Sequence, residues 1–406
     1  MSIAGDNMMS VKRNNRSAAL QLLHEEGSMS RKRLSEKLGL TPAAITKIVG
    51  EMMGEGILRE GETLPSGSAG RREVLVELNA RSKCALGVLI NLRQAILSGL
   101  WLDSDSIFSK EIPLPLQAPA EETVSMLSGM LLSLLQEHGI SRDKVIGIGI
   151  AVRGICSADG RTVTDSFGAL AESRFPLCQR FEEHTGLKAV MANNVRALFA
   201  AQMFLSRDRS EGAQFFLRCE YGIGASLSIN GKIWHGVTQQ CSEIGHIPVI
   251  ARGGKPCSCG KSGCLETIAS PVAICEDALE LFSEDKTPVL WNRFQKKKPK
   301  KLELNEVLDA ALSGDQGAGG IVDRAVKAIG TALKAVIYLI DPDKIVLYGK
   351  MFENPYYLSR LLSEMKEGVD TRHEVTIERS AYNHQLEDKA ASLLAVERFF
   401  ADGGTC

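Results

Sequence analysis

The chain has 406 residues, of which 44% are hydrophobic and 24% are charged, with 38 glycines and 13 prolines. These values predict two or three folded domains of a globular protein and exclude the disordered, collagen-like and coiled-coil classes. The formal net charge is −1, so any attraction to nucleic acid or to an anionic membrane must come from a local patch. Neither a signal-peptide pattern nor a run of 18 apolar residues is present, which favours a cytoplasmic protein without a membrane span.

A short segment near the start of the chain is strongly basic in a protein that is nearly neutral as a whole. Between residues 11 and 50, eight lysines and arginines face three glutamates. Three short helices are predicted here, because Gly27 interrupts the first, Ser30 caps the second, and Thr41 followed by Pro42 begins the third. Their inward-facing residues are predicted to be Ala18, Leu22 and Leu23, then Leu34 and Leu38, then Ile45, Ile48, Val49 and Met52.

Two predicted strands, residues 57–60 and 74–78, follow the helices and enclose a turn rich in glycine and serine. This order is typical of a winged helix-turn-helix, with a three-helix protein-binding module as the alternative. Small side chains on the third helix would let its backbone approach base edges in the major groove, and arginines on the wing could enter a minor groove. The predicted DNA contacts are Arg31, Lys32, Thr41, Ala43, Ala44, Thr46, Lys47, Arg71 and Arg72.

The remainder of the chain alternates predicted strands and helices, which indicates an α/β class. Strands are expected in residues 85–101, 145–152, 215–230 and 344–348, and helices in residues 268–281, 321–339 and 387–400. The expected domains are residues 1–80, residues 81–200 with the helix 386–401 packing back, and residues 201–385. The lysine run at 296–301 is interpreted as a solvated loop, with a nucleic-acid or targeting patch as the alternative.

One histidine and three cysteines, His246, Cys257, Cys259 and Cys264, provide a complete ligand set for a structural zinc ion. Glycines after the Cys-x-Cys pair suit a loop that wraps a metal. The alternative is a group of cysteines that simply lie in the core. The other cysteines are scattered, which argues against a disulfide framework.

The segment Glu243-Ile244-Gly245-His246, with the residues from Cys257 to Glu266, resembles the signature of the ROK family, which joins bacterial sugar kinases and sugar-responsive repressors. Residues 40–48 resemble the recognition helix of the repressor branch. The resemblance implies a two-lobed actin-like, ribonuclease-H-like ATPase fold behind the winged helix, with a zinc loop. It also implies a sugar between the lobes and assembly as a homodimer or tetramer.

The kinase branch of this family handles phosphate through elements that this sequence lacks. Leu89-Ile90-Asn91-Leu92-Arg93 stands where an Asp-x-Gly-Gly-Thr turn is expected, and Tyr221 replaces a threonine. Asn194 replaces the catalytic aspartate, and an amide cannot accept the proton of an attacking hydroxyl. Tyr348-Gly349-Lys350 replaces a glycine pair. The chain is therefore predicted not to be an enzyme.

The sugar contacts that the resemblance implies fall on Asn193, Asn194, Glu243, His246 and Glu266. Arg153 nearby could favour a phosphorylated or acidic sugar. The two glutamates could alternatively have supporting or surface roles. The sequence thus predicts a repressor of carbohydrate genes that binds operator DNA and senses a sugar or phosphosugar. The alternatives are a repressor governed by a protein partner and a sugar kinase fused to a DNA-binding domain.

Overall fold

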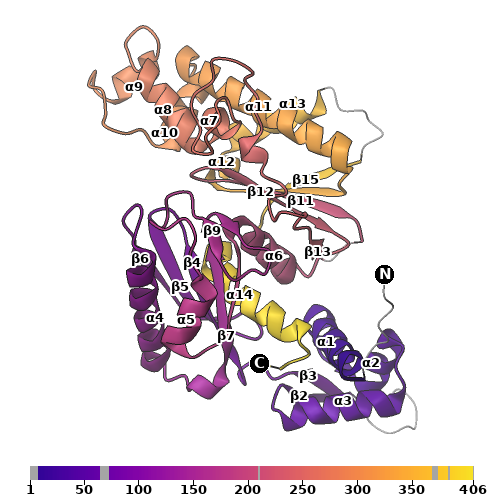
Figure 1. Cartoon of the computed structure of the whole chain (residues 1–406). Coiled ribbons are helices and arrows are strands. Elements are labelled where there is room, and N and C mark those ends of the chain that lie inside the picture. The colour runs from indigo at the N-terminus through magenta and orange to yellow at the C-terminus, as the bar shows by residue number, and fades with distance from the viewer. Residues whose placement is uncertain (1–7, 65–72, 209–210, 368–373, 383–384, 406) are drawn as a thin grey trace. The chain divides into compact units, whose positions relative to one another are not determined.

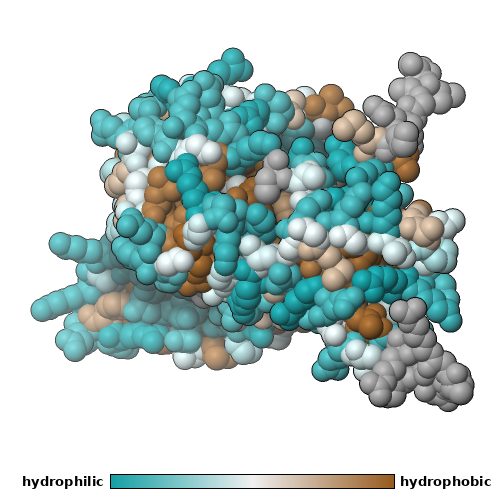
Figure 2. Space-filling view, turned by 90° about the horizontal axis from the view of Figure 1, so that it is seen from below, coloured by the Kyte–Doolittle hydropathy of each residue, from teal (hydrophilic) through white to brown (hydrophobic). Residues whose placement is uncertain are grey.

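The computed structural model describes residues 8–64, 73–208, 211–367, 374–382 and 385–405 (Figure 1). The chain separates into two compact units, one within residues 1–207 and 384–406 and the other within residues 208–383. None of the helices in the described part is long and apolar enough to cross a membrane. Hydrophilic residues cover most of the face seen in Figure 2, and apolar residues there gather in separate areas.

The first unit begins with three helices and a small antiparallel sheet. These are α1 (Met8–Glu26), β1 (Met29–Ser30), α2 (Arg31–Leu38), α3 (Pro42–Gly54), β2 (Leu58–Leu64) and β3 (Glu73–Leu78), with the strand order β1-β3-β2. The predicted caps are confirmed: Ser30 Oγ accepts a hydrogen bond from Arg33 N, and Thr41 Oγ1 accepts one from Ala44 N. The two-residue strand β1 was not predicted, because it is too short to show a periodic pattern.

The buried stripe of α3 is confirmed at all four predicted positions, whereas that of α1 is displaced from the prediction. Ala18 and Leu22 are only half-buried, and Arg16, Ala19, Leu20 and Leu23 are buried. The reason is that α1 packs against the last helix of the chain as well as against α2, so the buried face of α1 is rotated from the predicted one. Leu38 is half-buried because α2 ends beside it at Gly39, which has a positive φ of 63°.

An α/β lobe completes the first unit. Its sheet has the order β10-β7-β4-β5-β6, in which β10, β7 and β4 are parallel and β5 and β6 are antiparallel. The strands are β4 (Cys84–Ile90), β5 (Gln94–Trp101), β6 (Ser106–Pro113), β7 (Val145–Val152) and β10 (Ala189–Asn193), with a small pair β8 (Ile155–Cys156) and β9 (Val163–Asp165) beyond. The helices are α4 (Ala120–Glu137), η1 (Arg142–Lys144), α5 (Leu177–Thr185), α6 (Asn194–Ser206) and the C-terminal α14 (Gln385–Ala401).

Glycines in two neighbouring strands allow α14 to lie directly on this sheet. A Cβ on Gly149 would stand 1.7 Å from Ala391 O, and one on Gly87 would stand 2.4 Å from Ser392 N. Ser98 Oγ and Ser392 Oγ share a buried hydrogen bond of 2.7 Å. The opposite face of the sheet packs against α4 and α5 (Figure 1).

The second unit has a sheet of order β13-β12-β11-β14-β15. Its strands are β11 (Ala213–Cys219), β12 (Ile223–Ile229), β13 (Lys232–Ile233), β14 (Lys344–Tyr348) and β15 (Thr376–Arg379). Its helices are η2 (Ile244–His246), α7 (Glu266–Ala269), α8 (Pro271–Leu281), α9 (Pro288–Arg293), α10 (Leu304–Leu312), α11 (Gln316–Ile340), α12 (Lys350–Glu353) and α13 (Pro355–Lys366). Leucine, isoleucine, valine and alanine side chains of α8, α10 and α11 form its core with β11, β12 and β14.

The single helix predicted for residues 268–281 is wrong, because the structure has α7 and α8 in its place. Pro271 has no N–H and disfavours a helical residue before it, so the chain extends at Ser270, whose side chain caps α8 through Ala273 N (3.1 Å). The lysines at 296–301 lie, as predicted, in an exposed loop between α9 and α10.

Candidate functional site

The outer face of α3 consists mostly of small residues and carries one lysine. Pro42, Ala43, Thr46, Lys47 and Gly50 are exposed there, and Ala44 is half-buried. Thr46 Oγ1 donates a hydrogen bond of 2.7 Å to Pro42 O, so the hydroxyl is held by the helix itself. The face therefore combines close access to the backbone with an ammonium group, which suits an approach to base edges.

The predicted cations around α3 differ in their surroundings. Lys32 and Lys47 are exposed, and neither forms an ion pair within 4.0 Å among the described residues. Arg31 is half-buried, donates to Glu60 Oε1 (3.1 Å) and approaches Met53 Sδ (3.5 Å), so it connects α2 to β2 and α3. Arg71 and Arg72 lie outside the described residues.

Asn193 and Asn194 stand at the start of α6, in the first unit. Asn193 Oδ1 accepts hydrogen bonds from Val195 N (2.9 Å) and Arg196 N (3.3 Å), and its Nδ2 donates to Gly154 O (2.7 Å). The Asn193 side chain is therefore the cap of the helix as well as a candidate contact for a ligand.

Asn194 is only 5% exposed, and its Nδ2 donates a hydrogen bond of 3.1 Å to Asn91 Oδ1, which is also buried. Sequence reasoning missed this pair, because the two residues are separated by 103 positions. Leu89, where the kinase branch has a carboxylate, is fully buried in the sheet.

Glu243, His246 and Glu266 belong to the second unit, where the Glu266 carboxylate and the backbone of residues 243–246 lie at the start of β12. Glu266 Oε2 accepts a hydrogen bond from Ile223 N (2.9 Å), and Gly222 leaves room for it, since a Cβ there would stand 2.2 Å from that oxygen. Gly245, between Glu243 and His246, lies against Ile223 as well, because its Cβ would stand 2.0 Å from Ile223 O. The structure thus places one carboxylate and the segment 243–246 on the same strand end.

His246, Cys257, Cys259 and Cys264 form a compact group in the second unit, with all four ligand atoms within 4.8 Å of one another. Cys257 Sγ lies 3.5 Å from His246 Nδ1, and Cys259 Sγ lies 3.6 Å from Cys264 Sγ. A tetrahedral zinc ion with Zn–S bonds of ~2.3 Å requires ligand atoms to be roughly 3.5–3.8 Å apart. The arrangement could therefore hold such an ion. Burial raises the pKa of the Cys264 thiol to about 12, and the neighbouring thiols add to this rise.

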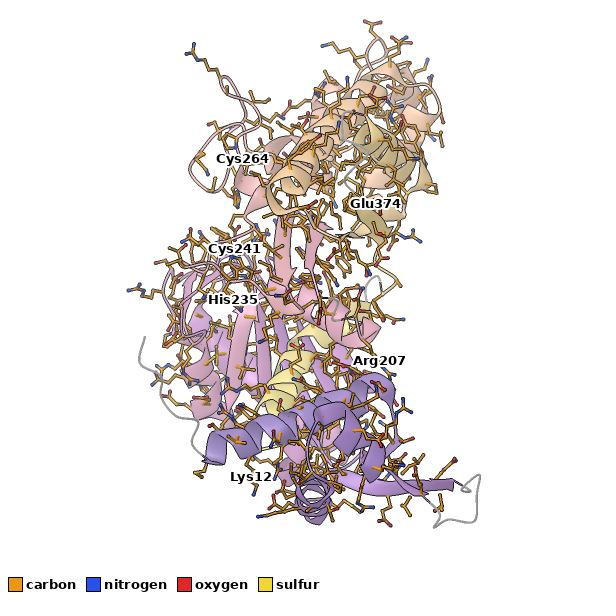
Figure 3. The ribbon with its side chains drawn as sticks, turned by 90° about the vertical axis from the view of Figure 1, so that its right-hand side faces the viewer. Lys12, Arg207, His235, Cys241, Cys264 and Glu374 are labelled. Atoms are coloured by element: carbon orange, nitrogen blue, oxygen red, sulfur yellow. The ribbon has the colours of Figure 1, made fainter. Side chains whose placement is uncertain are left out.

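The backbone of the cysteine loop is folded tightly around this group. Gly263 has a positive φ of 73° and lies against Ile250 O, which a Cβ would approach to 2.3 Å. Lys255 Nζ connects the loop to α8 through Asp277 Oδ1 (2.7 Å) and Glu280 Oε1 (3.0 Å), and the hydrogen bond to Asp277 raises the pKa of Lys255. Cys264 is labelled on this loop in Figure 3.

Comparison with known proteins places these features in a family. Residues 103–395 match the ROK family, and residues 13–59 match a winged helix-turn-helix DNA-binding domain. The DNA-binding transcriptional dual regulator NagC of Escherichia coli is 26% identical over 348 residues, which cover 84% of this chain and 82% of NagC. A glucokinase of Halalkalibacterium halodurans is 31% identical over 239 residues, which cover 59% of this chain and 72% of the glucokinase.

A crystal structure described as a ROK family transcriptional regulator, homologous to the Escherichia coli MLC protein, has the same fold. It superposes with a TM-score of 0.79 at 22% identity and covers 97% of this chain and 98% of its own. The ROK match alone spans well over half of the residues. The chain therefore belongs to the ROK family.

Proposed function

We propose that this protein is a DNA-binding transcriptional repressor that responds to a sugar. The observation that carries the proposal is the combination, on one chain, of an open recognition face on α3 and a ROK domain. Relatives named N-acetylglucosamine repressor and xylose repressor are similar to most of the chain, at 26% identity over 84% of this chain and 23% over 88%. The repressor acts as a homodimer or tetramer on a pseudo-palindromic operator.

Operator contacts are assigned to α3 and its surroundings. Ala43, Ala44 and Thr46 meet base edges and thymine methyl groups, and Lys47 and Lys32 contact phosphates. Thr41 caps α3 and faces the DNA backbone. Arg31, held by Glu60, orients the wing and reaches DNA only by leaving that carboxylate, and Arg71 and Arg72 complete the wing contact.

The effector is a sugar or phosphosugar, held by Asn193, Asn194, Glu243, His246 and Glu266. Amides and carboxylates suit this ligand class because each hydroxyl both donates and accepts hydrogen bonds. His246 Nδ1 faces Cys257, so Nε2 is the nitrogen assigned to a sugar hydroxyl. Glu266 already accepts from Ile223 N through Oε2, which fixes its orientation and directs Oε1 to the ligand.

A structural zinc ion is assigned to His246, Cys257, Cys259 and Cys264, where it would hold the segment that carries Glu243 and Glu266. Metal analysis of Cys259→Ser tests this, with Cys241→Ser as the matched control, because Cys241 lies outside the cluster and bonds to Trp234 O. One zinc ion per chain in the control and none in Cys259→Ser is expected. Full zinc content in Cys259→Ser would contradict the assignment.

A sugar kinase is the second candidate, since a glucokinase is among the relatives. We assign no phosphoryl transfer to this chain because an asparagine and a leucine, Asn194 and Leu89, stand where kinases need carboxylates. The Asn194 amide is bound to Asn91, and Leu89 is buried. A coupled ADP-release assay with glucose, xylose and N-acetylglucosamine tests this assignment. Turnover with any of them would establish the kinase instead.

The repressor function is tested by fluorescence anisotropy with promoter fragments from the genome that encodes the protein. Glucose, xylose, N-acetylglucosamine, glucose 6-phosphate and N-acetylglucosamine 6-phosphate are then titrated into the DNA complex. Saturable binding that salt weakens, and that one of these sugars alters, is expected. No binding to any fragment would refute the DNA-binding function. DNA binding that no sugar alters would favour control by a protein partner.

A further inference from the structure

Helix α6 connects the residues assigned to the effector with the winged helix that is assigned to DNA binding. Its N-terminal end carries Asn193 and Asn194, which are assigned to the effector, and its C-terminal end contacts α1 of the winged helix. Thirteen helical residues span about 20 Å. We infer that α6 transmits the state of the effector site to the DNA-binding domain, an inference that rests on the proposed function for the meaning of its two ends.

The contact at the C-terminal end of α6 is small and specific. His24 Nε2, near the end of α1, donates a hydrogen bond of 3.1 Å to Phe204 O, and the His24 ring stacks on the Phe204 ring at 3.9 Å between centroids. Arg207, the C-cap of α6 labelled in Figure 3, donates to Glu25 O at 3.2 Å. Phe400 of α14 lies 5.9 Å from both aromatic rings. Two adjacent residues of α1, His24 and Glu25, are thus hydrogen-bonded to the C-terminal end of α6.

The body of α6 is suited to moving as a rigid unit. Every residue from Asn194 to Phe204 is buried, and the helix packs along α14. Closely packed helices shift as bodies because their side chains leave no room for local bending. A change in the hydrogen bonds of Asn194, whose Nδ2 now binds Asn91, would therefore be felt at Phe204 and Arg207.

From α1 the connection continues to the recognition helix. Arg16, 5% exposed, donates to Glu55 Oε1 (2.8 Å) just beyond α3 and, through Nε, to Gly403 O (2.6 Å) beyond α14. Lys12 Nζ lies 2.8 Å from Glu51 Oε2 of α3. A displacement of α1 is thus carried to α3 by charged hydrogen bonds, which are shorter and stronger than neutral ones.

Coupling between the ends can be measured on the purified full chain without DNA or sugar, by hydrogen exchange of the amides in residues 20–26. Asn194→Ala is expected to speed exchange there by about threefold, because the α6 contact restrains α1. In a His24→Ala background the same substitution should have no further effect on that segment. A double-mutant cycle of this kind isolates the coupling from the cost of each single change.

The matched control is His138→Ala in the first unit. Like His24, His138 lies at the C-terminal end of a helix, approaches a carbonyl, Leu134 O (2.9 Å), and contacts a phenylalanine, Phe108 (5.2 Å), but that helix is α4. In that background the effect of Asn194→Ala on residues 20–26 should persist. Asn194→Asp, which keeps the shape and the acceptor for Val195 N, replaces Asn194→Ala if the latter does not fold.

An unchanged exchange rate in the Asn194 variant, or an equal change with and without His24, would overturn the inference. Its failure is distinct from failure of the proposed function, which is judged by promoter and sugar binding of the wild type. Where the wild type responds to a sugar, His24→Ala should bind that sugar with the same Kd but lose most of the change in promoter affinity. A full response in His24→Ala would count against α6 as the connection.

Discussion

Helices α3 and α6 have the same length and the same kind of start but opposite surroundings. Each has 13 residues, and each is capped by a polar side chain, Thr41 or Asn193. The outer face of α3 is exposed and composed of small residues, whereas α6 is buried on all sides from Asn194 to Phe204. A helix that contacts another molecule keeps one face exposed, whereas a helix that positions its neighbours within the fold is buried on all faces.

The largest difference between the two helices should appear in stability. Phe204→Ala removes a fully packed aromatic side chain from α6 and should lower the free energy of unfolding by about 3–5 kcal/mol. Thr46→Ala on the exposed face of α3 should change it by less than about 0.5 kcal/mol. Urea unfolding of both variants measures the difference, and a cost below about 1 kcal/mol for Phe204→Ala would show that α6 is not packed as described.

The next effect concerns DNA and should be confined to α3. Lys47→Ala should weaken promoter binding and reduce the slope of log K against log salt by up to ~1, since it removes one phosphate contact. Lys188→Ala is the matched control, because Lys188 is another exposed lysine of the first unit and follows α5. Anisotropy titrations at several salt concentrations provide the slopes, and equal slopes for the two variants would remove Lys47 from the interface.

The same contrast explains which parts of the molecule the sequence could predict. The alternation of Ile45, Ile48, Val49 and Met52 with polar residues specifies α3, its cap and its buried face from 13 local positions. The spacing of Cys257, Cys259 and Cys264 likewise predicted which side chains meet, although the metal they bind stays a prediction.

The surroundings of α6 could not be predicted in this way. A helix buried all round has no period to detect, and its partners lie far away in sequence: Asn91, His24 and Phe400. The break at Ser270 was missed for a different reason. The apolar pattern continues across it, and only the N-cap role of Ser270 and the missing N–H of Pro271 reveal it.

The two caps offer a smaller and more closely matched comparison. Thr41→Ala removes one side-chain acceptor and should cost about 1 kcal/mol of stability. Asn193→Ala removes an acceptor for two N–H groups and the donor to Gly154 O, so it should cost about 2 kcal/mol, at the upper end for caps. Thermal unfolding compares them, and an equal cost would mean that neither the second N–H nor the bond to Gly154 contributes to stability.

The smallest expected effect is a change in melting temperature with pH, and it concerns Glu51, the carboxylate near Lys47. A hydrogen bond from Lys12 lowers the pKa of Glu51 on α3, and one from Arg180 lowers the pKa of Glu183 on α5 in the same way. A lowered pKa in the folded state stabilises the fold above the unfolded-state pKa, and this contribution is lost as the pH falls through the folded-state pKa. Glu51→Gln and Glu183→Gln should therefore each melt slightly below the wild type at pH 7 and no longer do so at strongly acidic pH.

Only Glu51→Gln should also strengthen promoter binding, because it removes a negative charge that attracts Lys47 and repels phosphate. Glu183 is exposed and Glu51 is half-buried, so both melting shifts should be small, and the DNA affinity is the measurement that separates the two variants. If Glu183→Gln strengthened promoter binding equally, the gain would come from the net charge of the protein rather than from the recognition face. The α3 assignment would then have to rest on Lys47 and Thr46 alone.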